Sequence, residues 1–279
     1  MQIRLQELGR TITGCWASAE SNVRQLIAAK YSFPSEEILT FLLSGELRCA
    51  VSEASNAGQF DRAFLKDLKR HVPGLPEHYL QRFAGLIGRV NFHTRRHEGK
   101  RSAADFGVAI TRPEVRPFRI GQLQVIRDRT RGLLTQAKLG ISNSKRPGEV
   151  KWGRLTRQQK TLITDLSGYY ALLLYRLNDG RQLAPFAWQS CENVNSTDVE
   201  NWLQEGKFPM ELASTDIVNG LALGTFGTDS KEIVDRLIDP TSSRNTVEIC
   251  ITWPEGKDPP ASITQPIKEK QVVKQIIQM

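Results

Sequence analysis

The chain has 279 residues, of which 39% are hydrophobic and 24% are charged. These proportions are ordinary for a globular protein, and the length allows one large domain or two small ones. No stretch approaches the ~20 apolar residues of a membrane span, and the first ten residues lack the apolar centre of a signal peptide, so we expect a cytoplasmic protein with no membrane segment.

The net charge of +8 is spread unevenly along the chain. Residues 89–160 carry 18 Lys and Arg against 5 Asp and Glu, a local net charge of +13, and the remaining residues have a net charge of −5. Such a basic block is typical of a protein that binds a polyanion, and a solvated basic face without a partner is the alternative. The four cysteines are far apart, so no CxxC zinc or redox motif is present, and we expect reduced thiols.

Helical periodicity dominates the first 90 residues, after a polar start of little pattern at residues 1–14. Apolar residues spaced at three and four, with Ser18 and Ser35 as candidate N-caps, predict the first helices. The four helices expected here cover residues 18–30, 36–51, 60–71 and 79–90.

Two apolar segments in the middle of the chain predict neighbouring strands. They read FGVAI at residues 106–110 and GLLTQAKL at residues 132–139. The arginine-rich stretch between them, residues 111–131, is either a hairpin or a loop. The elements expected afterwards are a helix at 155–167, a buried strand at 169–177, an extended segment at 183–191, helices at 196–206, 214–220 and 231–238, a strand at 247–253, a linker at 254–265 and a tail at 267–279.

Polar residues on these two strands are the candidate site. Because side chains alternate between the faces of a strand, Gln136 and Lys138 share one face with Leu134. Asp105 opens the neighbouring strand, and Glu98 precedes it by seven residues. Burying such groups is costly unless they pair or hold a metal. The alternative is that Asp105 caps a turn, Lys138 lies at a sheet edge and Gln136 is solvated.

Glu98, Asp105 and Gln136-Ala137-Lys138 together resemble the PD-(D/E)xK nuclease superfamily, in the E…D…QxK variant that Mrr-like and Holliday-junction-resolvase-like endonucleases carry. The pattern is also similar to bacterial proteins tied to restriction and phage defence. The resemblance covers residues 36–177, in the order helix, Asp strand, QxK strand, helix and apolar strand. Two departures are Ala104, where glycine or proline is usual, and the long arginine-rich spacing.

The resemblance implies an α/β protein with a restriction-endonuclease-like central mixed sheet, flanked by helices and preceded by a helical N-terminal region. On this basis residues 1–90 lead into the core, residues 91–178 form the nuclease-like core, residues 179–254 are an extension or a small lobe, and residues 255–279 are a linker and tail.

The implied activity is a Mg²⁺-dependent (or Mn²⁺-dependent) endonuclease. Phosphodiester hydrolysis needs an activated water and a countercharge, which bound metal can supply. Asp105 and Gln136 would be metal ligands, and Lys138 would orient the water or stabilise the transition state. Glu98 is a further catalytic candidate. In the resembling families a first-helix glutamate lies near the metals; Glu36 is the closest match, and a role in complementing the helix dipole is equally open.

DNA is the partner that the resemblance implies, and the residues do not exclude RNA. The basic residues expected to bind nucleic acid are Arg95, Arg96, Lys100, Arg101, Arg129 and Arg131. A homo-oligomer and a subunit of a larger defence system both remain open. The alternative functions are a nucleic-acid-binding module with a degenerate nuclease site and a structural subunit whose basic block meets an acidic partner protein.

Overall fold

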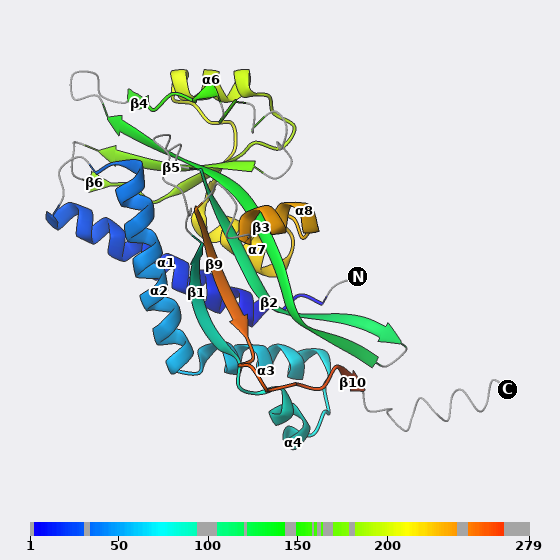
Figure 1. Ribbon diagram of the computed structural model, residues 1–279. Helices are drawn as coiled ribbons and strands as arrows, with labels where there is room; N and C mark the ends of the chain where they lie inside the picture. The colour runs from blue at the N-terminus through cyan, green and yellow to red at the C-terminus, as the bar shows by residue number, and fades with distance from the viewer. Residues whose placement is uncertain are drawn as a thin grey trace.

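A single mixed β-sheet runs through the molecule, and helices pack against both of its faces (Figure 1). The computed structural model describes residues 3–30, 34–93, 105–119, 122–142, 149–157, 159–160, 163, 170–178, 182–238 and 245–264. This architecture confirms the α/β class and the mixed sheet that the sequence predicts.

The helices of the described residues are α1 (Gln6–Lys30), α2 (Glu36–Asn56), α3 (Gln59–His71), α4 (Glu77–Leu80), the 3₁₀ turn η1 (Gln81–Phe83), α6 (Ser196–Glu205), α7 (Ser214–Leu223) and α8 (Lys231–Ile238). The strands are β1 (Ile87–His93), β2 (Asp105–Arg119), β3 (Gln122–Ser142), β4 (Val150–Trp152), β5 (Tyr170–Asn178), β6 (Gln182–Leu183), β7 (Ala187–Ser190), β8 (Glu211–Ala213), β9 (Asn245–Thr252) and β10 (Ser262–Thr264). Residues 157, 159, 160 and 163 are also helical.

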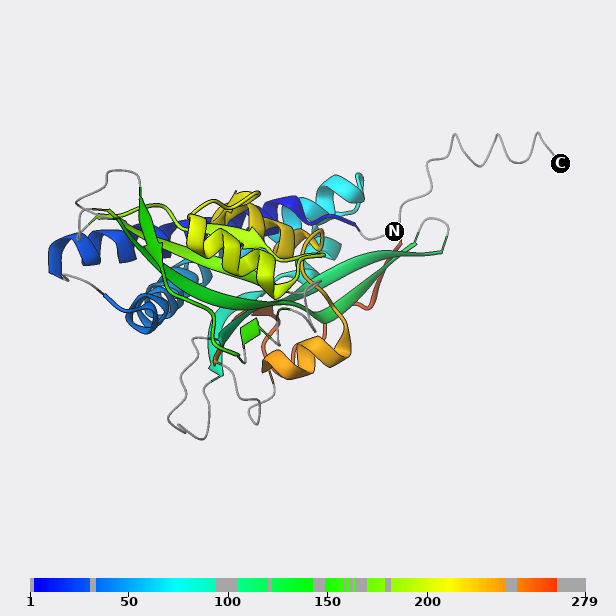
Figure 2. The ribbon, with the colours of Figure 1, turned by 90° about the horizontal axis from the view of Figure 1, so that it is seen from above.

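The strand order of the sheet is β1-β9-β2-β3-β5-β7-β8, with β4 and β10 paired to β3 and β6 paired to β5. Strands β2 and β3 form a long antiparallel hairpin, and β3 runs parallel to β5. The end of β2 and the start of β3 extend beyond the helices that cover the sheet (Figures 1 and 2). The arginine-rich segment therefore continues both strands, and of the two predicted alternatives it forms the hairpin and not the loop.

Buried apolar side chains form one cluster on each face of the sheet. Helices α1, α2, α3 and α7 contribute to the larger cluster, which includes Leu133 and Ala137 of β3. Helices α6 and α8 contribute to the smaller one, which includes Leu134. Figure 2 shows α1 and α8 on opposite sides of the sheet. The larger cluster runs from Leu5 to Ile263, so segments near both ends of the described chain share one core.

Helix α1 begins at Gln6, in a segment for which the sequence predicted no element. The buried residues on one side of it recur every three or four positions: Leu5, Leu8, Ile12, Trp16, Ala19, Val23 and Ile27. This stripe is readable in the sequence, but threonines and glycines of low helix propensity lie between its first members and obscure it. Neither α1 nor any other helix in the described ranges is apolar enough over a sufficient length to cross a membrane.

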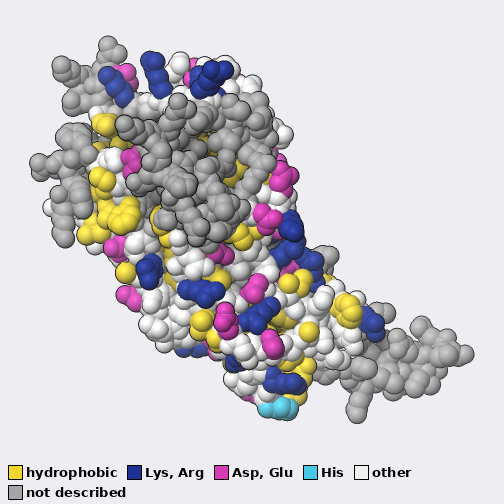
Figure 3. Space-filling model, viewed as in Figure 1, with side chains coloured by type: hydrophobic (Ala, Val, Ile, Leu, Met, Phe, Trp, Pro, Cys, Tyr) yellow, Lys and Arg dark blue, Asp and Glu magenta, His cyan; other side chains and the backbone are white. Residues whose placement is uncertain are grey.

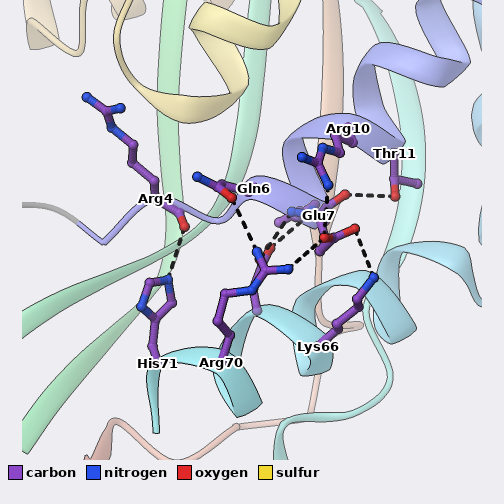
Figure 4. A network of polar contacts seen from close by, with 10 residues as sticks. Arg4, Gln6, Glu7, Arg10, Thr11, Lys66, Arg70 and His71 are labelled. Atoms are coloured by element: carbon purple, nitrogen blue, oxygen red, sulfur yellow. Dashed lines mark hydrogen bonds and ion pairs between the residues drawn. The ribbon is translucent and has the colours of Figure 1, made fainter.

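A buried carboxylate ties the start of α1 to α3. The two carboxylate oxygens of Asp67 accept the backbone N–H groups of Glu7 (3.1 Å) and Leu8 (3.0 Å), which belong to the first helical turn and cannot be satisfied within the helix. Beside it, the Glu7 carboxylate forms ion pairs with Arg70 and Lys66 (Figure 4). These hydrogen bonds, that of Arg70 foremost, hold the pKa of Glu7 below its usual value.

The prediction of a helix over residues 79–90 is confirmed as far as Phe83, through the end of α4 and η1, and is wrong beyond it. The chain reverses at Gly85, whose φ of 98° is a left-handed conformation that favours glycine. Asp61 fixes the reversal by accepting the backbone N–H groups of Gly85 (2.5 Å) and Leu86 (3.2 Å). The chain then enters β1, which pairs with β9. The apolar residues that suggested one long helix therefore belong to a short helix, a turn and a strand.

The chain beyond residue 179 extends the sheet on both sides of β2, β3 and β5. Strands β7 and β8 continue it past β5, while β9 inserts between β1 and β2 and runs parallel to β2. The predicted linker at 254–265 is wrong in part, because β10 pairs with the outer end of β3. A pairing of three residues has too few apolar positions to produce a recognisable sequence pattern.

Candidate active site

Asp105, Gln136 and Lys138 come together where β2 begins. The Cα of Asp105 pairs with that of Gln136 in the antiparallel register, and Lys138 lies two residues further along β3. Directly paired positions, and positions two residues apart, belong to the same face of a sheet. The backbone therefore brings the three positions to one face, while the side chain of Asp105 lies outside the described residues.

The predicted alternation along β3 is confirmed. Leu133 and Ala137 pack in the cluster formed with α1 and α2, whereas Leu134 packs in the cluster formed with α6 and α8. Gln136 and Lys138 share the face of Leu134, and their exposed fractions are 0% and 3%. This burial contradicts the alternative of a solvated glutamine and an exposed edge lysine.

Both buried polar side chains are hydrogen-bonded. The Tyr170 hydroxyl donates to Gln136 Oε1 at 3.3 Å. Lys138 Nζ donates to the carbonyl oxygen of Arg154 (3.0 Å) and to Oε1 of Gln159 (3.2 Å). These bonds offset the cost of removing an amide and an ammonium group from water.

Glu36 reaches the same part of β3 from the first turn of α2. One edge of β3 pairs first with β2, at Gln136, and then with β4, at Gly140. Between them, Glu36 Oε1 accepts the backbone N–H of Leu139 at 2.7 Å. Burial raises the pKa of the Glu36 carboxyl, and the positive charge of Lys138 opposes that increase. The charge of Lys138 therefore acts on this carboxyl group, and the catalytic role of Glu36 stays a prediction.

Ser35 fixes the residue at which α2 begins, and it thereby places Glu36 in the first turn of the helix. Its hydroxyl accepts the backbone N–H of Ile38 at 3.3 Å, so the predicted N-cap of α2 is confirmed. Leu39 and Leu43, on the next two turns, are buried in the larger cluster. The cap and the apolar stripe together direct the first turn of α2 toward β3.

Five of the predicted site residues lie outside the described residues, and nothing in the structure places them: Glu98, Arg95, Arg96, Lys100 and Arg101. Their assignment to catalysis or nucleic-acid binding stays a prediction.

The other two predicted nucleic-acid-binding residues have partners within the chain. Arg129 Nη2 lies 2.5 Å from Asp229 Oδ2, and Arg131 Nη2 lies 3.7 Å from the same oxygen. Arg129 also lies 3.6 Å from the buried carboxylate of Glu114. The hydrogen bond from Arg129 lowers the pKa of Asp229. Both arginines are therefore engaged by a carboxylate of the chain itself.

Charges of both signs are interspersed on the described surface of the face that carries α8 (Figure 3). Of the arginines on the β2–β3 hairpin, Arg116 pairs with Glu114 and Arg127 pairs with Asp258. The net positive charge of residues 89–160 is thus partly neutralised by Asp229 and Asp258, which lie outside that stretch of the sequence.

Two residues of the site were missed by sequence reasoning. Gln159 and Tyr170 are each 2% exposed and hydrogen-bond to Lys138 and Gln136, respectively. The spacing of Thr156 and Gln159 is that of a helix capping box, which signals a structural role but no contact with Lys138. Tyr170 opens an apolar strand and reads as a core residue.

The donor set at this end of the sheet fits a hard cation. A carboxylate from Glu36, the amide oxygen of Gln136 and a carboxylate at position 105 are the oxygen ligands that Mg²⁺ and Mn²⁺ accept. Within the described side chains, which exclude those of Asp105 and Glu98, no three His, Cys, Asp or Glu groups form a metal-binding cluster. This search does not include the predicted ligand Asp105, so its part in a metal site stays a prediction.

Comparisons with protein-family models, with known proteins and with solved structures find no match to this chain.

Proposed function

We propose that the protein is a metal-dependent nuclease that hydrolyses phosphodiester bonds of DNA on a restriction-endonuclease-like core. The main support is the register that pairs Asp105 with Gln136 and sets the buried Lys138 two residues further along. The order of α2, β2, β3, the helical residues 157, 159, 160 and 163, and β5 adds support, because β2 and β3 are antiparallel and β3 and β5 are parallel. The preference for DNA and a role in phage defence derive from the resemblance alone.

Each residue has a role that the reaction requires. Asp105 and Gln136 would hold Mg²⁺ or Mn²⁺, which supplies charge stabilisation and a more acidic water. Lys138 stabilises the negative charge that develops on the phosphoryl oxygens or orients the attacking water, and its effect is strengthened by the low dielectric of a buried site. Glu36 adds a second carboxylate close to Lys138.

The second candidate is a nucleic-acid-binding or structural subunit with a degenerate nuclease site. Gln136 favours it, because a neutral amide that already accepts the Tyr170 hydroxyl is a weaker metal ligand than a carboxylate. The internal ion pairs of Arg129 and Arg131 favour the structural form of this candidate over the binding form.

A cleavage assay with a parallel binding assay separates these functions. Supercoiled plasmid, single-stranded DNA and RNA are each incubated with protein in Mg²⁺, Mn²⁺, Ca²⁺ or EDTA, and binding is measured by fluorescence anisotropy in Ca²⁺. The nuclease proposal expects DNA cleavage in Mg²⁺ or Mn²⁺ and none in EDTA. Binding without cleavage supports the degenerate site, and the absence of both supports a structural subunit.

A further inference from the structure

We propose that Gln159 is a positioning residue for Lys138, and that the backbone N–H of Thr156, at the cap of the helix after β4, holds the amide oxygen of Gln159 in place. The inference rests on the proposed nuclease function, since Lys138 is its catalytic lysine. Thr156 N donates to Gln159 Oε1 at 2.9 Å, and Gln159 N donates to Thr156 Oγ1 at 3.3 Å. This reciprocal pair is a capping box, in which the third residue after the cap is glutamine or glutamate.

The oxygen that completes the capping box also accepts the lysine. Lys138 Nζ donates to Gln159 Oε1 at 3.2 Å, so this single oxygen serves two donors, one for each lone pair. Gln159 is 2% exposed and Lys138 is 3% exposed. The backbone N–H of Thr156 holds the amide oxygen of Gln159 in place. The ammonium group of Lys138 therefore donates to a side-chain oxygen whose position is fixed.

The same segment provides a second hydrogen-bond acceptor for Lys138. The carbonyl oxygen of Arg154 accepts Lys138 Nζ at 3.0 Å, and Arg154 lies two residues before Thr156. Residues 154–159 therefore provide two fixed oxygens for one ammonium group. Two fixed acceptors restrict the position and the rotation of the ammonium group, which carries three N–H donors. Catalytic groups need such support, because small displacements cost large factors in rate.

Three variants test the kinetic consequence. Gln159→Met keeps the shape of the side chain but removes the acceptor, and we expect kcat for DNA cleavage to fall about 10- to 100-fold with KM within about twofold of wild type. Gln159→Glu keeps both acceptor bonds and should retain kcat within about threefold. Thr156→Ala removes one bond of the cap but keeps the oxygen that Lys138 uses. It should lower the melting temperature while leaving kcat within about twofold. A kcat for Gln159→Met equal to that of wild type, or an equal loss in Thr156→Ala, would overturn the inference.

A second measurement follows Lys138 without any activity. Reductive methylation of the full-length protein, read by mass spectrometry, should modify Lys138 slowly in wild type and several-fold faster in Gln159→Met, or in Gln159→Ala if the methionine variant does not fold. Unchanged methylation of Lys138 in the folded variant contradicts the positioning role. Absence of cleavage by wild type on DNA and RNA would instead defeat the proposed function, so the two failures are distinguishable.

Discussion

Glu36 Oε1 accepts the backbone N–H of Leu139 at 2.7 Å, which joins the first turn of α2 to the edge of β3. The contact lies one residue from Lys138, whose charge acts on the same carboxyl group. A glutamate in this place completes the hydrogen bonding of a strand edge and adds a negative charge beside the candidate lysine. The structural role and the catalytic role can be separated by substitution.

Glu36→Gln should keep the fold and reduce activity. The amide oxygen still accepts the Leu139 N–H, and the loss of a buried charge should leave the melting temperature at pH 7 unchanged or higher. Cleavage should fall at least about tenfold, because the carboxylate near Lys138 is lost. Glu36→Ala, which also removes the acceptor, should cost about 1–2 kcal/mol of stability. The matched control is Glu37→Gln on the exposed side of α2; an equal loss of cleavage in this control would show that Glu36 has no specific role.

Lys138→Met should abolish cleavage and spare binding. The methionine retains much of the apolar volume of the lysine stem but cannot stabilise the charge of the transition state, so we expect a loss of about 10²-fold or more in kcat. Duplex affinity in Ca²⁺ should stay within about twofold of wild type. Lys151→Met, an exposed lysine on the neighbouring β4, is the control and should leave both quantities unchanged. Parallel losses of binding and cleavage in Lys138→Met would argue for a substrate-binding lysine.

Asp105→Asn should act through the metal. Asparagine is close in shape, so the protein should fold, but the neutral amide holds Mg²⁺ more weakly than a carboxylate. Wild type should gain melting temperature on addition of Mg²⁺, as ligand linkage requires, and Asp105→Asn should gain less and cleave little. Asp216→Asn, at an exposed position of α7, controls for the change in net charge. Wild-type cleavage by Asp105→Asn would remove this residue from the mechanism.

The sequence predicts those parts of the fold that depend on local periodicity. The alternation of β3 from Leu133 to Lys138, the apolar β5 and the Ser35 cap of α2 are all visible in short windows. The insertion of β9 between β1 and β2 is not, because it depends on a pairing between segments more than 130 residues apart in sequence. A three-residue strand such as β10 gives no signal at all.

The candidate site likewise has a part that local sequence predicts and a part that depends on long-range contacts. Gln136 and Lys138 can be placed on one face from spacing alone, and Asp105 can be assigned to the adjoining strand. The contacts that define their surroundings are long-range: Glu36 to Leu139 spans 103 residues, and Arg129 to Asp229 spans 100. Charge counting along the sequence overestimates the basic character of the hairpin, because it cannot see that distant acidic residues neutralise the arginines.

Asp67→Ala should destabilise the start of α1. The substitution leaves the backbone N–H groups of Glu7 and Leu8 without their buried acceptor, at a cost of about 2 kcal/mol or more. Asp67→Asn keeps one acceptor oxygen and should lose less. Arg10→Ala, which removes only the ion pair of a largely exposed arginine with Glu7, should cost under about 0.5 kcal/mol. Chemical denaturation of the three variants measures these differences, and equal losses in Asp67→Ala and Arg10→Ala would contradict the capping role.

Buried carboxyl groups should also shape the pH dependence of stability. Burial raises the pKa of Glu20 and Glu36 above 4.5 and that of Asp67 above 3.8, while the unfolded chain keeps the ordinary values. Between the ordinary and the raised values the folded protein binds more protons than the unfolded chain, so its free energy of unfolding increases as the pH falls through that interval. Glu7 and Asp229 act in the opposite sense, because hydrogen bonds with arginine lower their pKa.

The two groups of carboxyls act in different pH windows. The stabilisation from Glu7 and Asp229 is complete above their ordinary pKa and is lost as the pH falls below it toward their lowered values. We therefore expect the melting temperature to rise as the pH falls from neutrality toward the ordinary carboxyl pKa values, and to decline as it falls below them. The double variant Glu20→Gln/Glu36→Gln keeps the hydrogen-bond acceptors for Phe186 and Leu139 but cannot titrate, so its melting temperature should change less between pH 7 and 5. A wild-type melting temperature that stays constant or falls over that interval would show that burial does not raise these pKa values.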